Sequence, residues 1–144
     1  MVNVVLTLIA LLPLFATTTT QNIEKAFLQN NSKMLLSLFP PKSHINISLP
    51  APISFADQVS NQQAYFLFKK IFSSYATFEF YSERQKPNFQ SDGTILKARW
   101  SFRDKKNNNQ YVFNIFFYLI RIEAHDTDQN NNAWQITEIK AEKI

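Results

Sequence analysis

Apolar residues between Asn22 and Phe39 fall one, three or seven positions apart, which keeps them on one face of an α-helix. The apolar positions are Ile23, Ala26, Phe27, Met34, Leu35 and Leu38. Pro40 and Pro41 follow and cannot donate hydrogen bonds to a preceding helical turn. The pattern therefore predicts one amphipathic helix that ends before Pro40.

A second helix is predicted after a short strand. Residues 44–49 alternate between polar and apolar, which indicates a strand, and Pro50 and Pro52 confine residues 51–55 to an edge or an extended connection. Ser54 and Asp57 have the spacing of a capping box. The apolar stripe of this second helix is Ala64, Leu67, Phe68, Ile71, Phe72 and Tyr75.

The chain after Tyr75 has the two-residue period of β-strands. We expect strands over residues 77–84, 94–103, 110–124 and 133–143, with Phe78 and Phe80 on one face of the first. Asp92-Gly93 is the strongest tight-turn signal, and polar loops occupy residues 104–109 and the asparagine-rich segment before Ala133. This part of the chain predicts an antiparallel sheet.

Pairing Arg103 with Gln110 makes the two longest strands agree on which face is buried. The predicted core face carries Leu96, Ala98, Trp100, Phe102, Tyr111, Phe113, Ile115, Phe117 and Leu119. The outer face carries Val112, Phe116, Tyr118, Ile120 and Ile122, a set apolar enough to suggest that something covers it. In the last strand, a bulge near Thr137-Glu138 would bring Trp134, Ile136, Ile139 and Ala141 to one side.

Composition sets limits on function. The 144 residues fit one domain with a large core, to which 14 phenylalanines contribute. The chain has no cysteine and a single glycine, which excludes disulfides, thiolate metal sites and glycine-rich phosphate loops, so no cofactor is expected. The net charge of +4 comes from scattered residues and favours anionic partners only weakly.

The N-terminal segment is predicted to direct export. The first 23 residues carry no charged side chain, and Val4 to Ala16 is an apolar stretch of signal-peptide length. Ala16-Thr17-Thr18 is a small-x-small cleavage site, so we assign residues 1–20 to a signal peptide and 21–144 to one domain, periplasmic or secreted after cleavage. A retained anchor and a buried strand are the alternatives.

The order of helix, short strand, helix and long antiparallel strands resembles the nuclear transport factor 2-like (cystatin-like) cone, and more narrowly a family of small secreted bacterial domains of unknown function. The resemblance is carried by residues 23–27 (IEKAF), 68–72 (FKKIF) and 136–140 (ITEIK). It implies an α+β fold in which two N-terminal helices pack in the concave face of a curved antiparallel sheet of four to six strands. Such cones host isomerases, dehydratases, transport adaptors and binding modules, so the fold alone does not assign a function.

Three motifs are weak candidates for chemistry. Residues 126–130 begin like a calcium loop, but Asn131 and Thr137 stand where the loop needs glycine and glutamate. His125 could act as a base oriented by Asp126, but neighbouring residues at the end of a strand point in different directions, and His44 stands alone at the start of the first strand. The basic residues from Lys97 to Lys106 alternate with aromatic residues that face the other side of the sheet, so nucleic-acid binding is not expected.

The inner and outer faces of the sheet supply the candidate sites. The candidate pocket lining is Tyr65, Phe66, Phe80, Trp100, Tyr111 and Phe113, and no catalytic acid or base can be placed in it. The candidate interface is Val112, Phe116, Tyr118 and Ile120. We therefore expect a non-enzymatic module that binds itself, an envelope protein or a small apolar ligand, with membrane contact only through the export segment. A cone-pocket isomerase or dehydratase and a purely structural accessory domain are the alternatives.

Overall fold

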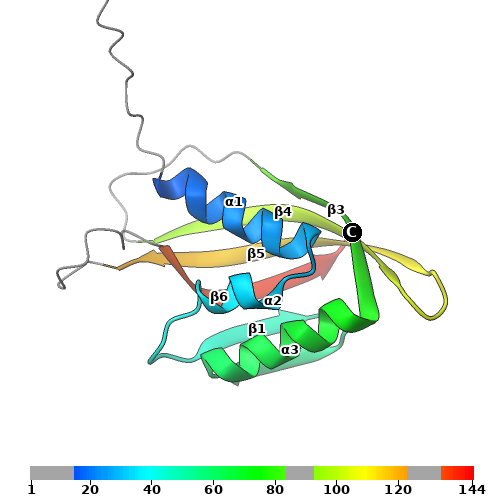
Figure 1. Cartoon of the computed structure of the whole chain (residues 1–144), viewed down its shortest axis with the longest axis horizontal. Helices are drawn as coiled ribbons and strands as arrows, with labels where there is room; N and C mark the ends of the chain where they lie inside the picture. Colours follow the sequence, from blue (N-terminus) through cyan, green and yellow to red (C-terminus); the bar gives the residue numbers. More distant parts are fainter. Residues whose placement is uncertain (1–14, 84–92, 123–133) are drawn as a thin grey trace, which may run out of the picture.

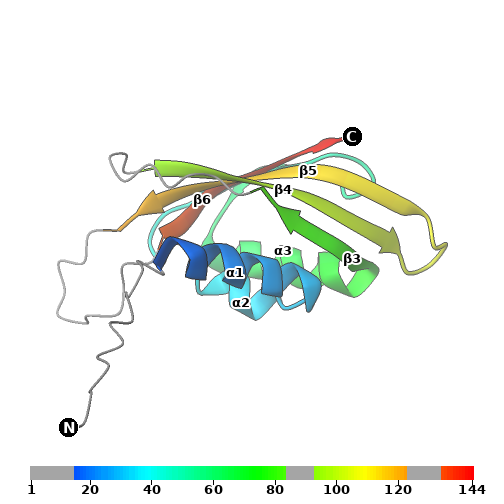
Figure 2. The same cartoon turned by 90° about the horizontal axis from the view of Figure 1, so that it is seen from above.

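Three helices cover one face of a six-stranded sheet (Figures 1 and 2). The computed structural model describes residues 15–83, 93–122 and 134–144. The strand order is β2-β1-β6-β5-β4-β3. The elements are α1 (Phe15–Leu28), α2 (Ser32–Leu36), β1 (Ile45–Leu49), β2 (Phe55–Val59), α3 (Asn61–Ser74), β3 (Tyr75–Ser82), β4 (Gly93–Asp104), β5 (Gln110–Arg121) and β6 (Trp134–Lys143).

The register predicted for the central hairpin is confirmed. Arg103 pairs with Gln110, and the pairing continues to Gly93 opposite Ile120. Every residue of the predicted core face is buried except Tyr111, which is partly buried. Side-chain alternation was sufficient here because a slip of one residue would turn a row of large apolar side chains out to solvent.

The sheet is mixed, which corrects the expectation of an antiparallel sheet. β1 lies beside β6 and runs parallel to it, with Ile47 opposite Ile139. All other neighbouring strands are antiparallel. Parallel neighbours need a long crossover connection, and here α3, β3, β4 and β5 all lie between the two strands in the sequence.

The predicted helix over residues 22–39 is two helices, so the helical layer has three members instead of two. Asn30 has a positive φ of 51°, which ends α1, and the Asn31 side chain accepts hydrogen bonds from the backbone N–H groups of Lys33 and Met34. Asparagine is suited to both positions because it tolerates the left-handed region and caps helix N-termini. The apolar spacing continues across this break and conceals it.

The capping box predicted at Ser54 and Asp57 is wrong, and a capping box six residues later starts α3. The Ser60 Oγ accepts a hydrogen bond from the Gln63 N–H, while the Gln63 side chain accepts from the Ser60 N–H. Residues 55–59 instead form β2, which pairs with β1. Pairing with β1 gives these residues a ladder of backbone hydrogen bonds, so the prolines at 50 and 52 belong to the β1–β2 connection.

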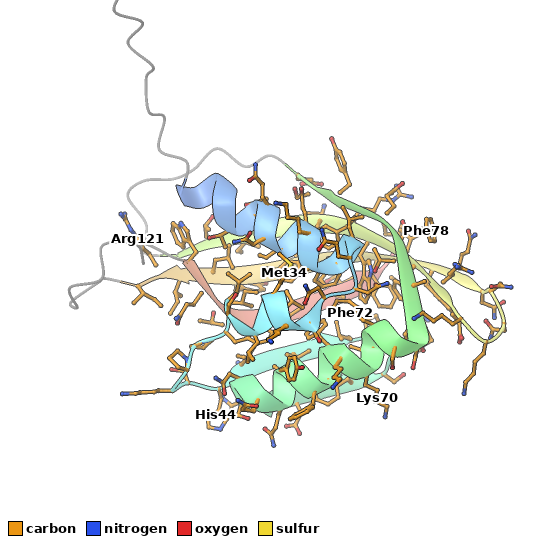
Figure 3. All side chains as sticks on the ribbon, viewed as in Figure 1. Met34, His44, Lys70, Phe72, Phe78 and Arg121 are labelled. Atoms are coloured by element: carbon orange, nitrogen blue, oxygen red, sulfur yellow. The ribbon has the colours of Figure 1, made fainter. Side chains whose placement is uncertain are left out.

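Two bulges decide which side chains enter the core. In β3 the register shifts between Thr77 and Glu79, so Phe80 is buried but Phe78 is 50% exposed. The two phenylalanines therefore do not share a face, contrary to expectation, and Figure 3 shows Phe78 at the periphery and Phe72 in the interior. The bulge predicted in β6 is confirmed at Thr137, and Ile136, Ile139 and Ala141 are buried on one side of the strand. Trp134 packs against the same core.

Phe27 lies at the centre of the core between the helices and the sheet. Its ring centroid lies 4.6–5.9 Å from the centroids of Phe68, Phe72, Phe80, Trp100 and Phe117. These rings come from α1, α3, β3, β4 and β5, so one side chain holds the two layers together. A second link is the hydrogen bond of 2.8 Å from the Ile136 N–H to the Leu38 carbonyl, which joins the segment after α2 to β6.

Candidate functional site

Half of the predicted pocket lining lies together in the interior. Phe80, Trp100 and Phe113 are buried, and Trp100 and Phe80 each contact Phe27. The only polar atom of the Trp100 side chain is satisfied, since its Nε1–H donates to Thr77 Oγ1 at 2.9 Å. Aromatic rings therefore occupy the space next to these residues, and a ligand pocket there stays a prediction.

The other predicted pocket residues lie elsewhere. Tyr65 and Phe66 contact each other on α3, and Phe66 is 59% exposed on the side of the helix opposite the core. Lys69 Nζ lies 6.0 Å from the centre of the Tyr65 ring. Tyr111 lies at the β4–β5 hairpin end of the sheet, where its ring stacks on Phe102 with 5.6 Å between centroids.

A tyrosine that the sequence did not single out completes this end of the sheet. Tyr75 was assigned to the apolar stripe of the second helix, but it is the first residue of β3 and pairs with Asp104. Its ring packs edge-on against Phe102 at 5.3 Å, and its hydroxyl donates to the Pro52 carbonyl at 3.5 Å. Tyr75, Phe102 and Tyr111 thus form an aromatic group with two partly buried phenols.

The environment of Tyr75 keeps its phenol protonated. Burial raises the pKa of Tyr75 above its ordinary value of 10.0, and electrostatic repulsion from Asp104 and Tyr111 raises it further. A phenol held neutral in this way donates a hydrogen bond but does not act as a base near neutral pH. The chemistry available at this end of the sheet is therefore hydrogen bonding to a polar group.

The face of the sheet turned away from the helices carries the second candidate site. α1, α2 and α3 all lie on the opposite face (Figure 2). Four side chains predicted as an interface, Val112, Phe116, Tyr118 and Ile120, alternate with buried residues along β5, and Ile120 is 43% exposed. Ile95 joins them because it lies directly opposite Tyr118 and is 40% exposed. We call these five residues the outer strip; Ile95 could have been added to it from the predicted register alone.

Charged residues frame the outer strip. Phe116 lies between Lys97 on β4 and Lys140 on β6, and Lys97 Nζ is 5.9 Å from the centre of its ring. The surrounding ion pairs are Lys97–Glu83 at 3.4 Å, Arg99–Glu79 at 3.7 Å and Lys140–Glu142 at 3.9 Å. An apolar centre with a rim of both charge signs is the usual anatomy of a protein–protein interface.

The candidate bases and ligands are not gathered into a site in the described part of the chain. His44 is exposed just before β1, and Figure 3 places it at the edge of the molecule. Within residues 15–83, 93–122 and 134–144, no three histidine, cysteine or acidic side chains come together as metal ligands. His125 and the calcium-like segment 126–130 lie outside the described residues, as does Asp92 of the predicted turn.

The fold is shared with solved structures of low sequence identity. A DUF4783 family protein from Bacteroides ovatus is 15% identical, with a TM-score of 0.62 over 85% of this chain and 93% of that one. A ketosteroid isomerase-like protein from Erwinia carotovora atroseptica is 12% identical, with a TM-score of 0.65 over 92% and 97%. A putative dehydratase of the NTF2-like family from Streptomyces avermitilis is 8% identical, with a TM-score of 0.60 over 90% and 94%.

These likenesses confirm, at the level of the fold, the resemblance to nuclear transport factor 2-like domains and to a bacterial family of unknown function. No protein-family model and no curated protein sequence matches the chain. At such identities the shared architecture does not transfer catalytic residues.

Proposed function

We propose that this chain is an exported, non-enzymatic binding module whose outer strip binds a second protein, in the first instance another copy of itself. The observation that carries the proposal is the outer strip, in which Ile95, Tyr118 and Ile120 are adjacent on a face that no described helix covers. Contiguous apolar surface of this kind on a soluble domain typically marks an interaction site.

The mixed charges beside the strip suit a two-fold symmetric contact. In such a contact the same patch meets itself, so it must present groups that complement one another. β4 and β6 place charges of both signs next to the outer strip. Lys97 and Lys140 flank Phe116 on either side, and Glu138 lies opposite Tyr118, two positions further along β5. A second copy rotated over this face can bring basic residues over acidic ones.

Sedimentation equilibrium of the purified protein tests the proposal. We expect a concentration-dependent dimer that Ile95→Lys and Ile120→Lys convert to monomer, because each places a charge in the apolar centre. Phe66→Lys, at an even more exposed apolar site on α3, serves as the control and leaves the dimer intact. A wild-type protein that stays monomeric at millimolar concentration would reject the dimer and leave only a different protein as the partner.

Export is supported by the sequence of the N-terminal segment. Residues 4–16 are largely apolar, and the small residues that follow make Ala16-Thr17-Thr18 a predicted cleavage site. None of the helices in residues 15–83 has the length and apolar character needed to cross a bilayer. Mass spectrometry of the protein recovered from the periplasm or medium should find an N-terminus between about residues 17 and 21; an intact Met1 would argue against cleavage.

A second candidate function is a cone-pocket enzyme of the isomerase or dehydratase type, acting on a small apolar ligand. It is favoured by the two partly buried phenols, Tyr75 and Tyr111, because a neutral phenol can polarise a carbonyl group. Isomerisation of a β,γ-unsaturated ketone, followed by ultraviolet absorbance, tests it. A rate above buffer that disappears in Tyr75→Phe/Tyr111→Phe would support an enzyme; no rate above buffer would reject it.

A further inference from the structure

The helical layer presents a one-sided distribution of charge. α1, α2 and α3 carry four lysines, Lys25, Lys33, Lys69 and Lys70, and a single carboxylate, Glu24. Glu24 is partly buried and accepts a hydrogen bond from the Ser82 hydroxyl, so it is turned toward β3. All four lysines are exposed.

The strands differ sharply from the helices in this respect, because their basic and acidic residues nearly balance. The basic residues of the strands are Lys97, Arg99, Arg103, Arg121, Lys140 and Lys143, and the acidic ones are Asp57, Glu79, Asp104, Glu138 and Glu142. Three of these basic residues, Lys97, Arg99 and Lys140, form ion pairs with other described residues. Within residues 15–83, 93–122 and 134–144, none of the four helical lysines forms an ion pair. Lys69 instead makes a cation–π contact with the Tyr65 ring.

Two large apolar side chains project from the same layer. Leu28, at the end of α1, is 48% exposed, and Phe66, in α3, is 59% exposed. Lys25 precedes Leu28 by three positions, and Lys69 and Lys70 follow Phe66 by three and four, so each apolar side chain has a lysine on the same helical face. α2 packs against both α1 and α3, which makes the layer continuous (Figure 1). We call these six residues the basic helical face.

We propose that the basic helical face docks on an anionic lipid surface, with Leu28 and Phe66 entering the interface between head groups and acyl chains. Exposed lysines around protruding apolar side chains are the composition of peripheral membrane contacts, where electrostatic attraction adds to apolar burial. A lipid surface fits better than an acidic protein because the lysines are spread over three helices and form no ion pair with any other described residue, which suits a diffuse plane of negative charge. The basic helical face and the outer strip lie on opposite sides of the sheet, so the proposed membrane contact does not use the outer strip.

Flotation of the purified protein with lipid vesicles tests the proposal. Vesicles of phosphatidylcholine alone report the binding that needs no anionic lipid, from Leu28, Phe66 and any N-terminal segment that is retained, and vesicles with phosphatidylglycerol add the charge. Each lysine near such a surface changes affinity about fivefold, so Lys25→Gln/Lys69→Gln/Lys70→Gln should weaken binding to the anionic vesicles on the order of 100-fold. High salt should have the same effect on the wild-type protein.

The matched control is a triple variant that removes the same net charge from exposed positions outside the helices, Lys106→Gln/Arg121→Gln/Lys143→Gln. Its affinity for the anionic vesicles should stay within about twofold of the wild-type value, because the attraction of a charge to the membrane falls off within a Debye length of the surface. Leu28→Ser/Phe66→Ser should weaken binding, whereas Tyr81→Ser, at an exposed residue of β3, should not. Circular dichroism confirms that each variant is folded.

Equal affinity for neutral and anionic vesicles would overturn the proposal, as would an equal loss in the two charge variants. Lysine-dependent binding to poly-glutamate without binding to vesicles would overturn it in favour of an acidic protein partner.

Discussion

Replacing Phe27 by alanine removes the ring at which α1, α3 and three strands meet. The side chain is fully buried and contacts five other aromatic rings. Truncating a buried phenylalanine costs about 3–5 kcal/mol, because the lost transfer free energy is joined by the cost of the cavity. Rigid aromatic neighbours collapse poorly into a gap, so we place Phe27→Ala near the upper end of that range.

A loss of this size is large against the stability of a domain, which is typically about 5–15 kcal/mol. The assay is urea denaturation followed by circular dichroism, in which the midpoint should fall while the m-value stays unchanged. Phe66→Ala is the matched control: the same substitution on the exposed side of α3 should change the free energy of unfolding by less than about 0.5 kcal/mol. Comparable losses in the two variants would refute the assignment of Phe27 to the centre of the core.

Three further predictions concern polar contacts. Thr77→Val leaves the buried Trp100 Nε1–H without its acceptor and should cost about 1–3 kcal/mol in urea denaturation, with a smaller loss when Trp100→Phe is also present. Because the pKa of Tyr75 is higher in the folded than in the unfolded chain, the unfolded chain loses the phenolic proton first, and the free energy of unfolding should fall as pH rises above about 10. Tyr75→Phe should remove that part of the fall. If the variant has the same pH profile as the wild-type protein, the burial of the Tyr75 hydroxyl is contradicted. Lys105→Met removes the 3.0 Å hydrogen bond from Nζ to the carbonyl of Phe72 near the C-terminus of α3 and should lower the thermal midpoint by a few degrees, with a loss of about 1 kcal/mol, whereas Lys106→Met should not.

Local periodicity was sufficient in β4, β5 and β6, where large apolar side chains fit only one face of the strand. The pairing of Arg103 with Gln110 and the bulge at Thr137 both followed from keeping large apolar side chains on one side. The same reasoning failed at Asn30, because the apolar spacing of a helix continues across a break that depends on asparagine conformation and capping. It also missed the bulge that exposes Phe78, since β3 has apolar residues available for either face.

Contacts between segments that are distant in sequence were harder to predict from the sequence. Nothing in the alternation of residues 45–49 distinguishes a parallel from an antiparallel neighbour, so the β1–β6 pair was not predicted. Tyr75 fitted the helical stripe as well as the strand, and its partners Asp104 and Pro52 are remote in sequence. The outer strip was largely predicted, because its residues are the alternate positions of a strand whose register was already known.

The place of β6 in the sheet has a consequence for how the chain folds. β6 lies between β1 and β5, so among the described strands the β1–β2 hairpin is joined to the rest of the sheet through β6 alone. Closing the β1–β6 pair brings together segments from opposite ends of the domain, and such non-local pairings are slow to form. Folding of the sheet to completion must therefore wait until β6 has been synthesised after the five other described strands. Until then the edges of β1 and β5 remain open to other chains, which is the condition in which a holding chaperone is most needed.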